Sequence, residues 1–252
     1  MSTPLFSIVI PCRNAAATIR RALESCVAQS CDDYELVIVD GASTDGTTEI
    51  IGEFQDATGG RLRLISEPDD GIYDAMNKGL AAARGEWVAF LGADDWYEPG
   101  ALATVRDCFS APAEGSRVDC VGGAMWVVEP DGHRDVRLPH PGLLRRRFPK
   151  AMPAGHQAWF ARSELLRRVG GFNTDFRLAA DYELYLRVQA SGSAPVWVFT
   201  DTPIVNFTLG GASWALRACA RDYRAAKLAN GDRAFHADVV YVRNLILARL
   251  AR

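Results

Sequence analysis

Two adjacent carboxylates, Asp94 and Asp95, directly follow an apolar run in the segment FLGADDW. Like charges side by side repel each other, and neither carboxylate will be buried without a compensating positive charge. The pair therefore lies either in a solvated turn before Trp96 or beside a cation. Carboxylate oxygens suit Mg²⁺ or Mn²⁺, and Mg²⁺ usually takes one or two protein carboxylates together with substrate phosphates. The position at the end of a buried strand favours the metal.

A third carboxylate, Asp181, opens the predicted helix ADYELYLRV. The apolar stripe of this helix contains Leu184, Tyr185 and Val188, and Asp181 precedes the first two by three and four residues. It therefore faces the same, inward side. An inward carboxylate at a helix start is either a cap or a reactive group that the helix dipole keeps ionised. Spacing alone favours the cap. Glu183 is expected on the surface.

Strand and helix signals alternate through the first half of the chain, and near-continuous apolar runs are typical of strands buried on both faces. This alternation predicts a parallel sheet with right-handed crossovers. The expected strands span 5–10, 34–40, 62–66 and 86–91. Between them we expect a helix capped by Asn14 and running to Val27, helices over 47–54 and 72–83, and a last one from Pro99 to Phe109.

The second half has a different pattern. We expect a strand and hairpin over 117–136 that turns at EPDGH, a strand and short helix over 158–172, a helix over 180–191 and one or two strands over 194–207. Two helices, near 214–230 and 236–251, end the chain. The pattern divides the chain into 1–115 and 116–212, as halves of one domain, and a helical segment over 213–252.

Polar residues follow each of the four strands of the first half, in the segments PCRN, DGASTDG, EPDDG and GADD. Ligands bind beyond the carboxyl ends of parallel strands, so these segments predict one shared site. DGASTDG is neither a dinucleotide fingerprint nor a phosphate loop, which disfavours a standard NAD enzyme or NTPase. Asp40 either accepts hydrogen bonds from a base or ribose or forms a turn, and Asp45 is expected in a turn or helix cap.

Two further polar segments stand apart from the strand ends. His156 and Gln157, in AGHQAWF, form either a polar loop or a contact to phosphate or acceptor, and the four histidines lack zinc-ligand spacing. The segment LGGAS at 209–213 is either a turn or an amide-rich helix start that meets phosphate.

Basic residues gather in the segment LRRRFPK, which contains Arg145, Arg146, Arg147 and Lys150. They form either a solvated loop or a contact to an acidic glycan, a lipid diphosphate or anionic headgroups. The apolar, Arg-bearing segment over 239–252 could lie on a membrane surface, or pack on its own domain or on a partner chain in a homodimer. The prediction is peripheral membrane contact through both segments.

Composition narrows the class of protein. The net charge of −3 argues against nucleic acid as a partner, and a hydrophobic content of 48% allows a sizeable core. The six cysteines are scattered without a CxxC pair. No signal peptide precedes the first apolar run, and no uncharged apolar stretch is long enough to span a membrane. We therefore expect a cytoplasmic protein, at the inner face of the cytoplasmic membrane.

The segments SIVIPCRN, VIVDGASTDGT, DGIYDAMNKGLAAARGEWVAFLGADD and AADYELYLR together resemble the inverting glycosyltransferases of family 2. The likeness spans residues 5–210 and is greatest to bacterial enzymes of exopolysaccharide, capsule and lipopolysaccharide synthesis. It implies the GT-A fold, a nucleotide-binding α/β sheet with a C-terminal acceptor-binding part. It also implies a nucleotide-diphosphate sugar, often UDP-linked, as donor, Mn²⁺ or Mg²⁺ as cofactor, and a glycan or lipid-linked saccharide as acceptor.

The same resemblance assigns roles to the residues that match its motifs. Asp95 would bind the metal directly with Asp94 in support, and Asp181 would be the catalytic base. The donor would contact the remaining matched residues, Pro11, Asn14, Asp40, Arg84, His156 and Gln157. The family often has a second aspartate after the one that matches Asp40, but Gly41 stands here, which leaves the base and ribose contacts open.

Two other functions compete with this interpretation. A nucleotidyltransferase that makes nucleotide sugars also needs a metal and an α/β site, but it should have a Gly-rich basic loop after the first strand. PCRNAAATIR contains no glycine. A non-catalytic nucleotide-sugar-binding protein would not need carboxylates at 94, 95 and 181, although their presence does not exclude one.

Overall fold

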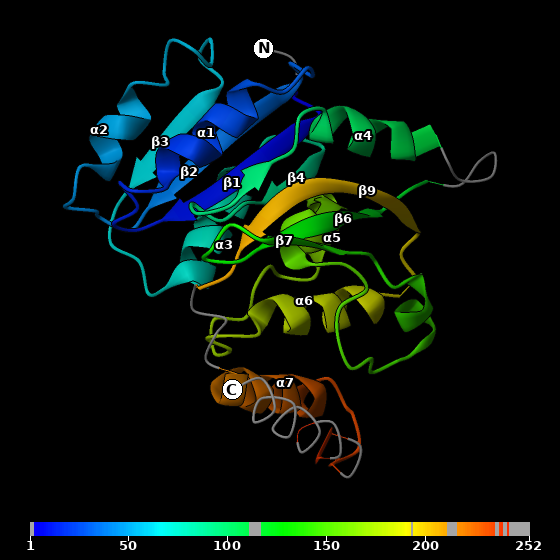
Figure 1. The fold of residues 1–252 in the computed structure, drawn as a ribbon. Helices are drawn as coiled ribbons and strands as arrows, with labels where there is room; N and C mark the ends of the chain where they lie inside the picture. The colour runs from blue at the N-terminus through cyan, green and yellow to red at the C-terminus, as the bar shows by residue number, and fades with distance from the viewer. Residues whose placement is uncertain are drawn as a thin grey trace.

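The computed structural model describes residues 3–110, 117–192, 194–210, 216–234, 237–238 and 241. The described strands are β1 (Phe6–Cys12), β2 (Tyr34–Asp40), β3 (Leu62–Ser66), β4 (Trp87–Phe90), β5 (Trp96–Tyr97), β6 (Cys120–Val128), β7 (Arg134–Arg137), β8 (Trp159–Arg162) and β9 (Trp197–Thr208). They form one sheet in the order β3-β2-β1-β4-β8-β6-β9-β5, and β7 pairs with β6. Figure 1 shows this sheet curving through the molecule.

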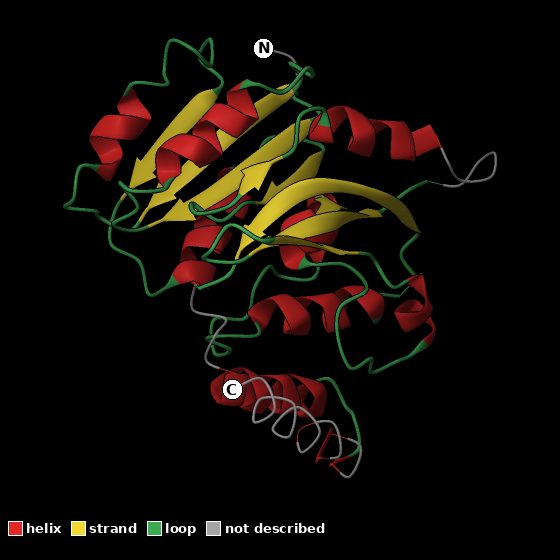
Figure 2. Ribbon diagram, viewed as in Figure 1, coloured by secondary structure: helices red, strands yellow, loops and turns green. Residues whose placement is uncertain are grey.

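The helices are α1 (Ile19–Val27), α2 (Thr47–Gly52), α3 (Ile72–Ala82), α4 (Ala101–Asp107), α5 (Ser163–Arg168), α6 (Ala180–Gln189) and α7 (Leu216–Ala229). Short 3₁₀ turns are η1 (Cys108–Ser110), η2 (Pro141–Arg145) and η3 (His156–Ala158). Figure 2 shows helices on both faces of the sheet, with α6 and α7 stacked beyond its lower edge. Most of the predicted helix over 236–251 and most of LGGAS lie outside the described residues.

The four parallel strands of the first half occur as predicted, because their apolar runs supply both faces of the sheet. Successive side chains of β1 point to opposite faces. Ile8 packs in the cluster that also holds Leu23 of α1, while Val9 packs in the cluster that holds Met76 of α3. All seven residues of β1 and of β2 are buried. This rigid half fixes the direction of the strand ends.

The strands of the second half join the same sheet as those of the first. The antiparallel pairing of β4 with β8 connects the two halves, and the predicted hairpin is present as β6 and β7. The predicted strand over 194–207 is the single strand β9, which runs parallel to β6. Four strand pairings are parallel and four antiparallel, so the sheet is mixed but less parallel than predicted.

The prediction that Asn14 caps the first helix is wrong. Helix α1 begins at Ile19, with Thr18 at the N-cap position and no side-chain cap. Asn14 has a left-handed backbone with φ of 49°, and its side-chain oxygen instead accepts a hydrogen bond from the Thr44 amide at 3.0 Å. Its side chain therefore joins the two loops that follow β1 and β2.

The expectation that Glu183 lies on the surface is also wrong. Glu183 is buried because α6 is covered by the sheet on one side and α7 on the other. Its carboxylate accepts a fork of hydrogen bonds from Arg187, from Nε to Oε1 at 2.8 Å and from Nη2 to Oε2 at 2.6 Å. Arg187 also donates to the Gly171 carbonyl at 2.6 Å. This pair fixes α6 against the turn after α5.

Replacing Arg187 with methionine should therefore destabilise the protein by about 3 kcal/mol, because it leaves the buried Glu183 carboxylate without its cationic partner. Denaturant unfolding measures the change. The double variant with Glu183→Gln should recover part of the loss, and Arg168→Met, at an exposed position of α5, is the matched control. A loss below about 1 kcal/mol for Arg187→Met would show that the pair is not a stabilising contact.

Candidate active site

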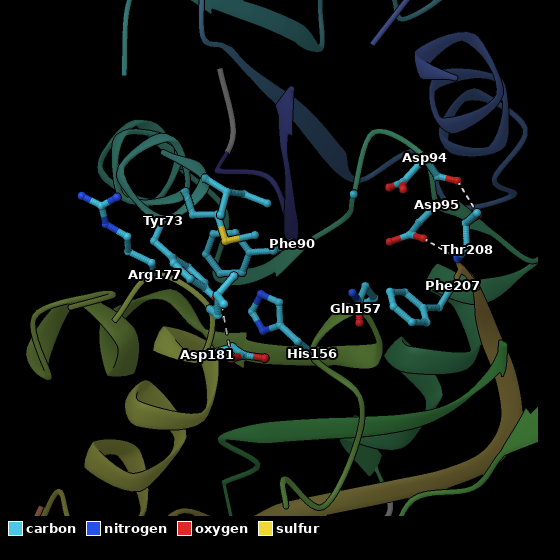
Figure 3. Close-up of a pocket in the computed structure, with 14 residues that line it drawn as sticks. Tyr73, Phe90, Asp94, Asp95, His156, Gln157, Arg177, Asp181, Phe207 and Thr208 are labelled. Carbon is cyan, nitrogen blue, oxygen red and sulfur yellow. Dashed lines mark hydrogen bonds between the residues drawn. The ribbon is translucent and has the colours of Figure 1, made fainter. Parts of the chain in front are cut away.

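The acid pair lies in the turn between β4 and β5, at the carboxyl end of a buried strand. Thr208, the last residue of β9, holds this turn (Figure 3): its amide donates to Asp95 Oδ1 at 2.8 Å, and its hydroxyl donates to the Asp94 carbonyl at 2.7 Å. Asp95 is only 2% exposed. Burial raises the pKa of Asp95 to about 7, and the charge of Asp94 adds to this shift.

The free oxygens of the two carboxylates converge over Gly92. A methyl group at Gly92 would lie 2.6 Å from Asp95 Oδ2 and 2.9 Å from Asp94 Oδ1, so a side chain here would fill the space between them. Arg21 supplies nearby positive charge. Its guanidinium lies 3.6 Å from the centre of the Trp96 ring and donates to the Asp94 carbonyl at 2.8 Å, but it forms no ion pair with either carboxylate.

Asp181 lies across the same cavity, in the first turn of α6. The preference for a helix cap is not confirmed, since Ala179 occupies the N-cap position and no side chain caps the helix. Asp181 Oδ1 instead accepts hydrogen bonds from the Tyr182 amide at 2.8 Å and the Tyr73 hydroxyl at 3.4 Å. The Tyr73 ring stacks on Phe172, which places its hydroxyl next to this carboxylate.

The cavity between these carboxylates has a volume of about 180 Å³. Its carboxylates and other polar side chains come from five separate segments of the chain. The lining residues are Ile72, Tyr73, Met76, Phe90, Gly92, Asp94, Asp95, His156, Gln157, Arg177, Leu178, Asp181, Phe207 and Thr208. The structure thus brings five of the predicted site residues together: Asp94, Asp95, His156, Gln157 and Asp181.

His156 and Gln157 occupy the one-turn η3 that precedes β8. The His156 ring stacks on Phe90, with 5.5 Å between centroids and 18° between planes. Burial lowers the pKa of His156, and the neighbouring Asp181 opposes that shift. The imidazole is therefore neutral at pH 7. In Figure 3, His156 lies beside Asp181, and Gln157 lies between His156 and Asp95.

Asp40 lies apart from the residues that line this cavity. It is fully buried at the end of β2, where Ser66 Oγ donates to Oδ2 at 2.7 Å and the Ser43 amide donates to the same oxygen at 3.0 Å. Burial raises the pKa of Asp40, but these hydrogen bonds outweigh it and hold the pKa below its usual value. The Asp40 side chain therefore organises the loop after β2. The turn role of Asp45 is confirmed, because its carboxylate accepts from the Thr47 amide at 3.1 Å.

Pro11 and Asn14 lie at the carboxyl end of β1, beside the same loop. Pro11 is buried within the strand, beyond Val9, where pairing with β4 ends. Arg84 requires a correction, since the structure does not bring it to the site. It is exposed before the start of β4, and its amide donates to Glu35 near the start of β2. Arg84 therefore lies at the edge of the sheet opposite the acid pair.

Gly41 has a close neighbour that explains the absence of a side chain. A methyl group at Gly41 would lie 2.3 Å from Asp69 Oδ2, an oxygen of the loop after β3. A second aspartate after Asp40 would require the Asp69 carboxylate to move. The carboxylate of Asp69 thus occupies the space that such a side chain would take.

The basic segment lies against α6 and α7, away from the carboxylates. Arg146 and Arg147 line a cavity of about 440 Å³ together with Phe148 and the last residues of α6. Two hydrogen bonds hold the segment in place: Lys227 Nζ donates to the Phe148 carbonyl at 3.1 Å, and the Tyr182 hydroxyl donates to the Pro149 carbonyl at 2.5 Å. Among the described residues, no helix is long and apolar enough to cross a membrane.

Sequence reasoning did not identify Thr208, Tyr73, Arg177 or Phe207 as site residues. Tyr73 lies in the segment DGIYDAMNKGLAAARGEWVAFLGADD. A tyrosine at this position gave no sign that its hydroxyl would contact Asp181, 108 residues later. Thr208 ends β9, which pairs with β6 and with β5, and β5 has only two residues and no detectable period.

The donor set fits a hard divalent cation. Two carboxylate oxygens converge, one of them on a buried residue whose ionised form has no ion-pair partner in the described part of the chain. No group of three or more metal-binding side chains occurs among the described residues. Asp94 and Asp95 are thus too few for a closed metal cage but suited to a cation shared with a phosphate-bearing ligand.

The fold is of the GT-A class. A solved structure of a Pyrobaculum calidifontis mannosyltransferase in complex with GDP-Man and Mn²⁺ has a TM-score of 0.69 and 20% identity, covering 100% of this chain and 77% of that one. TarS 1–349 from S. aureus in complex with UDP has a TM-score of 0.67 and 18% identity, covering 95% and 70%. At these identities the likeness concerns the fold alone.

The chain belongs to glycosyl transferase family 2, whose model matches residues 7–170. A relative from Mycobacterium tuberculosis, named as a PGL/p-HBAD biosynthesis glycosyltransferase, is 39% identical over 188 residues. That match covers 74% of this chain and 70% of the relative.

Proposed function

We propose that the chain is an inverting glycosyltransferase that moves a sugar from a nucleotide-diphosphate sugar, UDP-linked, to a hydroxyl of a glycan or lipid-linked acceptor. The pathway would be the synthesis of bacterial cell-surface polysaccharides or glycolipids. One observation carries the proposal: the acid pair Asp94 and Asp95 and the separate carboxylate Asp181 face one cavity. The name of the mycobacterial relative and the nucleotide complexes of the structural neighbours support it.

In the proposed reaction, Asp181 accepts the proton of the acceptor hydroxyl as that oxygen attacks the anomeric carbon. The new bond forms from the face opposite the diphosphate. The bond to the diphosphate oxygen breaks, and its electron pair leaves with the nucleotide. One such displacement inverts the anomeric carbon. Tyr73 orients the Asp181 carboxylate through its hydroxyl.

Asp95 and Asp94 would hold Mn²⁺ or Mg²⁺, which when bound supplies positive charge that stabilises the departing diphosphate. The hydrogen bond from Thr208 engages Oδ1 of Asp95, so Oδ2 would be the oxygen that binds the cation. Pro11, Asn14 and Asp40 would form the nucleotide side of the site, with Asp40 acting on a base or ribose through the loop that it organises.

We propose the acceptor-binding surface from the positive charge of the basic segment. Arg146 and Arg147, with Arg145 and Lys150 in the same segment, offer contacts to an acidic glycan, a lipid diphosphate or the anionic headgroups at the inner face of a membrane. Peripheral membrane contact through this segment and the C-terminal residues, and a homodimer, remain proposals.

The test is metal-dependent donor cleavage. We expect purified protein with Mn²⁺ to release the nucleoside diphosphate slowly from one member of a panel of UDP- and GDP-linked sugars, measured by coupled detection of the free diphosphate. Chelation with EDTA should stop the release. Binding without cleavage, with or without added acceptors, would indicate a nucleotide-sugar-binding protein. Pyrophosphate formation from UTP and a sugar 1-phosphate would indicate a nucleotidyltransferase.

A further inference from the structure

Two neighbouring polar side chains in the cavity have no hydrogen-bond partner in the described part of the chain. His156 is 8% exposed, and neither Nδ1 nor Nε2 is hydrogen-bonded. The amide of Gln157 makes no hydrogen bond within the described residues either. A buried polar group left without a hydrogen-bond partner destabilises the folded chain, which concerns the buried His156 more than the half-buried Gln157. Both side chains line the cavity, so a bound molecule is the available partner.

The surrounding side chains fix the direction of the His156 ring. One face stacks on Phe90, and Phe172 and Trp159 meet the ring at steep angles of 84° and 72°. The turn that carries the ring is fixed as well. Gly155 lies so close to Met125 that an added methyl group would be 2.4 Å from the sulfur. The ring is thus held by packing, and both of its nitrogens are buried without a hydrogen-bond partner in the described part of the chain.

The chemistry of the two side chains suits hydroxyl groups rather than phosphate. A neutral imidazole has one donor and one acceptor, and a side-chain amide has both kinds of group. A sugar hydroxyl also donates and accepts, whereas an ionised phosphate only accepts. No positive charge comes from either side chain, and three carboxylates line the same cavity against one cationic side chain, Arg177. These features disfavour an anion directly against His156 and Gln157.

Their position agrees with this chemistry. Figure 3 shows His156 and Gln157 between Asp181 on one side and the acid pair on the other. In the proposed reaction the acceptor oxygen lies at Asp181 and the diphosphate lies at the acid pair. The sugar that moves between them must therefore lie against His156 and Gln157.

We propose that His156 and Gln157 bind hydroxyl groups of the transferred sugar and thereby determine which sugar the chain accepts from its donor. The proposal rests on the proposed function and extends it to the recognition of the sugar.

The experiment compares binding of a nucleotide sugar with binding of its nucleoside diphosphate, which lacks the sugar. Calorimetric titrations with Mn²⁺ would use UDP, UDP-glucose, UDP-galactose, UDP-N-acetylglucosamine and UDP-N-acetylgalactosamine, and GDP with GDP-mannose. His156→Phe keeps an aromatic ring in the stack but removes both nitrogens, and Gln157→Leu removes the amide. His133→Phe, at an exposed position of the β6–β7 hairpin, is the matched control.

We expect each site variant to bind the preferred nucleotide sugar about tenfold more weakly, while the nucleoside diphosphate binds within about twofold of the unaltered protein. The double variant should also lose discrimination between the glucose and galactose epimers. If His156→Phe does not fold, Gln157→Leu gives the same comparison at a half-buried position.

Equal weakening of the nucleotide and the nucleotide sugar, or no weakening of either, would overturn this assignment and leave the proposed function intact. Failure of the unaltered protein to bind any nucleotide or nucleotide sugar of the panel would overturn the proposed function, and this assignment with it.

Discussion

Asp181→Asn is expected to lower kcat for sugar transfer by about 10²–10⁴-fold, because asparagine keeps the shape of the side chain but does not accept the proton of the acceptor hydroxyl. Its amide can still meet the Tyr73 hydroxyl and the Tyr182 amide, so the first turn of α6 should stay in place. Binding of the nucleotide with Mn²⁺ should be nearly unchanged, since the acid pair lies on the other side of the cavity.

Steady-state kinetics on the donor found in the panel, with separate values of kcat and KM, checks this result. Asp175→Asn, an exposed position before α6, is the matched control and should transfer normally. Near-normal turnover by Asp181→Asn would remove Asp181 from the role of base.

Asp95→Asn should have opposite effects on stability and on activity. Without metal the buried Asp95 carboxylate destabilises the folded chain at neutral pH, because burial and Asp94 raise its pKa to about 7. Asparagine removes that charge, so at pH 8 the variant should unfold at a higher temperature than the unaltered protein. Metal-dependent donor cleavage should nevertheless fall by about a hundredfold or more, because one of two carboxylate ligands is lost.

The pH dependence follows from which state keeps the proton on Asp95. Below about pH 4 the carboxyl is protonated in both the folded and the unfolded chain, so it has no effect on stability. Between about pH 4 and 7 only the folded chain keeps the proton. As the pH rises through this range, the free energy of unfolding of the unaltered protein therefore falls relative to that of Asp95→Asn, by up to about 1.4 kcal/mol per pH unit. The difference levels off above about pH 7.

Thermal unfolding from pH 5 to 8, with and without Mn²⁺, checks this prediction. A cation that binds the ionised carboxylates should raise the midpoint of the unaltered protein at pH 8 and leave that of Asp95→Asn unchanged. Asp56→Asn, exposed between α2 and β3, is the control for loss of one charge. A pH-independent difference between Asp95→Asn and the unaltered protein would contradict the buried-charge explanation.

The fold was predictable where local pattern and tertiary structure agree. The apolar runs of β1 and β2 are buried on both faces, and such runs have no other stable place in a soluble α/β sheet. Strand β5 was not predictable, because two residues, Trp96 and Tyr97, carry no period and pair only through distant β9. Burial of Glu183 was missed for a similar reason: a helix covered on both sides has no polar face.

The candidate site was predictable where it follows from the rule that ligands bind beyond the carboxyl ends of parallel strands. That rule predicted Asp94 and Asp95 at the carboxyl edge of the sheet. Spacing predicted only that Asp181 faces inward and favoured a helix cap, so its place in the site came from the family resemblance. The prediction that Arg84 lies in the site was wrong. A motif match does not show at which end of a strand a residue lies, and Arg84 lies before the amino end of β4. The prediction that Asn14 caps the first helix was wrong because its side chain accepts a hydrogen bond from the loop after β2. That contact depends on the spacing of β1 and β2 rather than on the local sequence.

The two hydrogen bonds from Thr208 to the turn of the acid pair affect which parts of the chain can be exchanged as units. The family model ends at residue 170, yet the residue that fixes Asp94 and Asp95 lies 38 positions beyond that limit. A chain cut at residue 170 would keep every carboxylate of the donor side but lose the strand that orients them. The two halves therefore cannot be exchanged independently between relatives. A swap of the acceptor part must carry β9 with it, matched to the β4–β5 turn of the recipient.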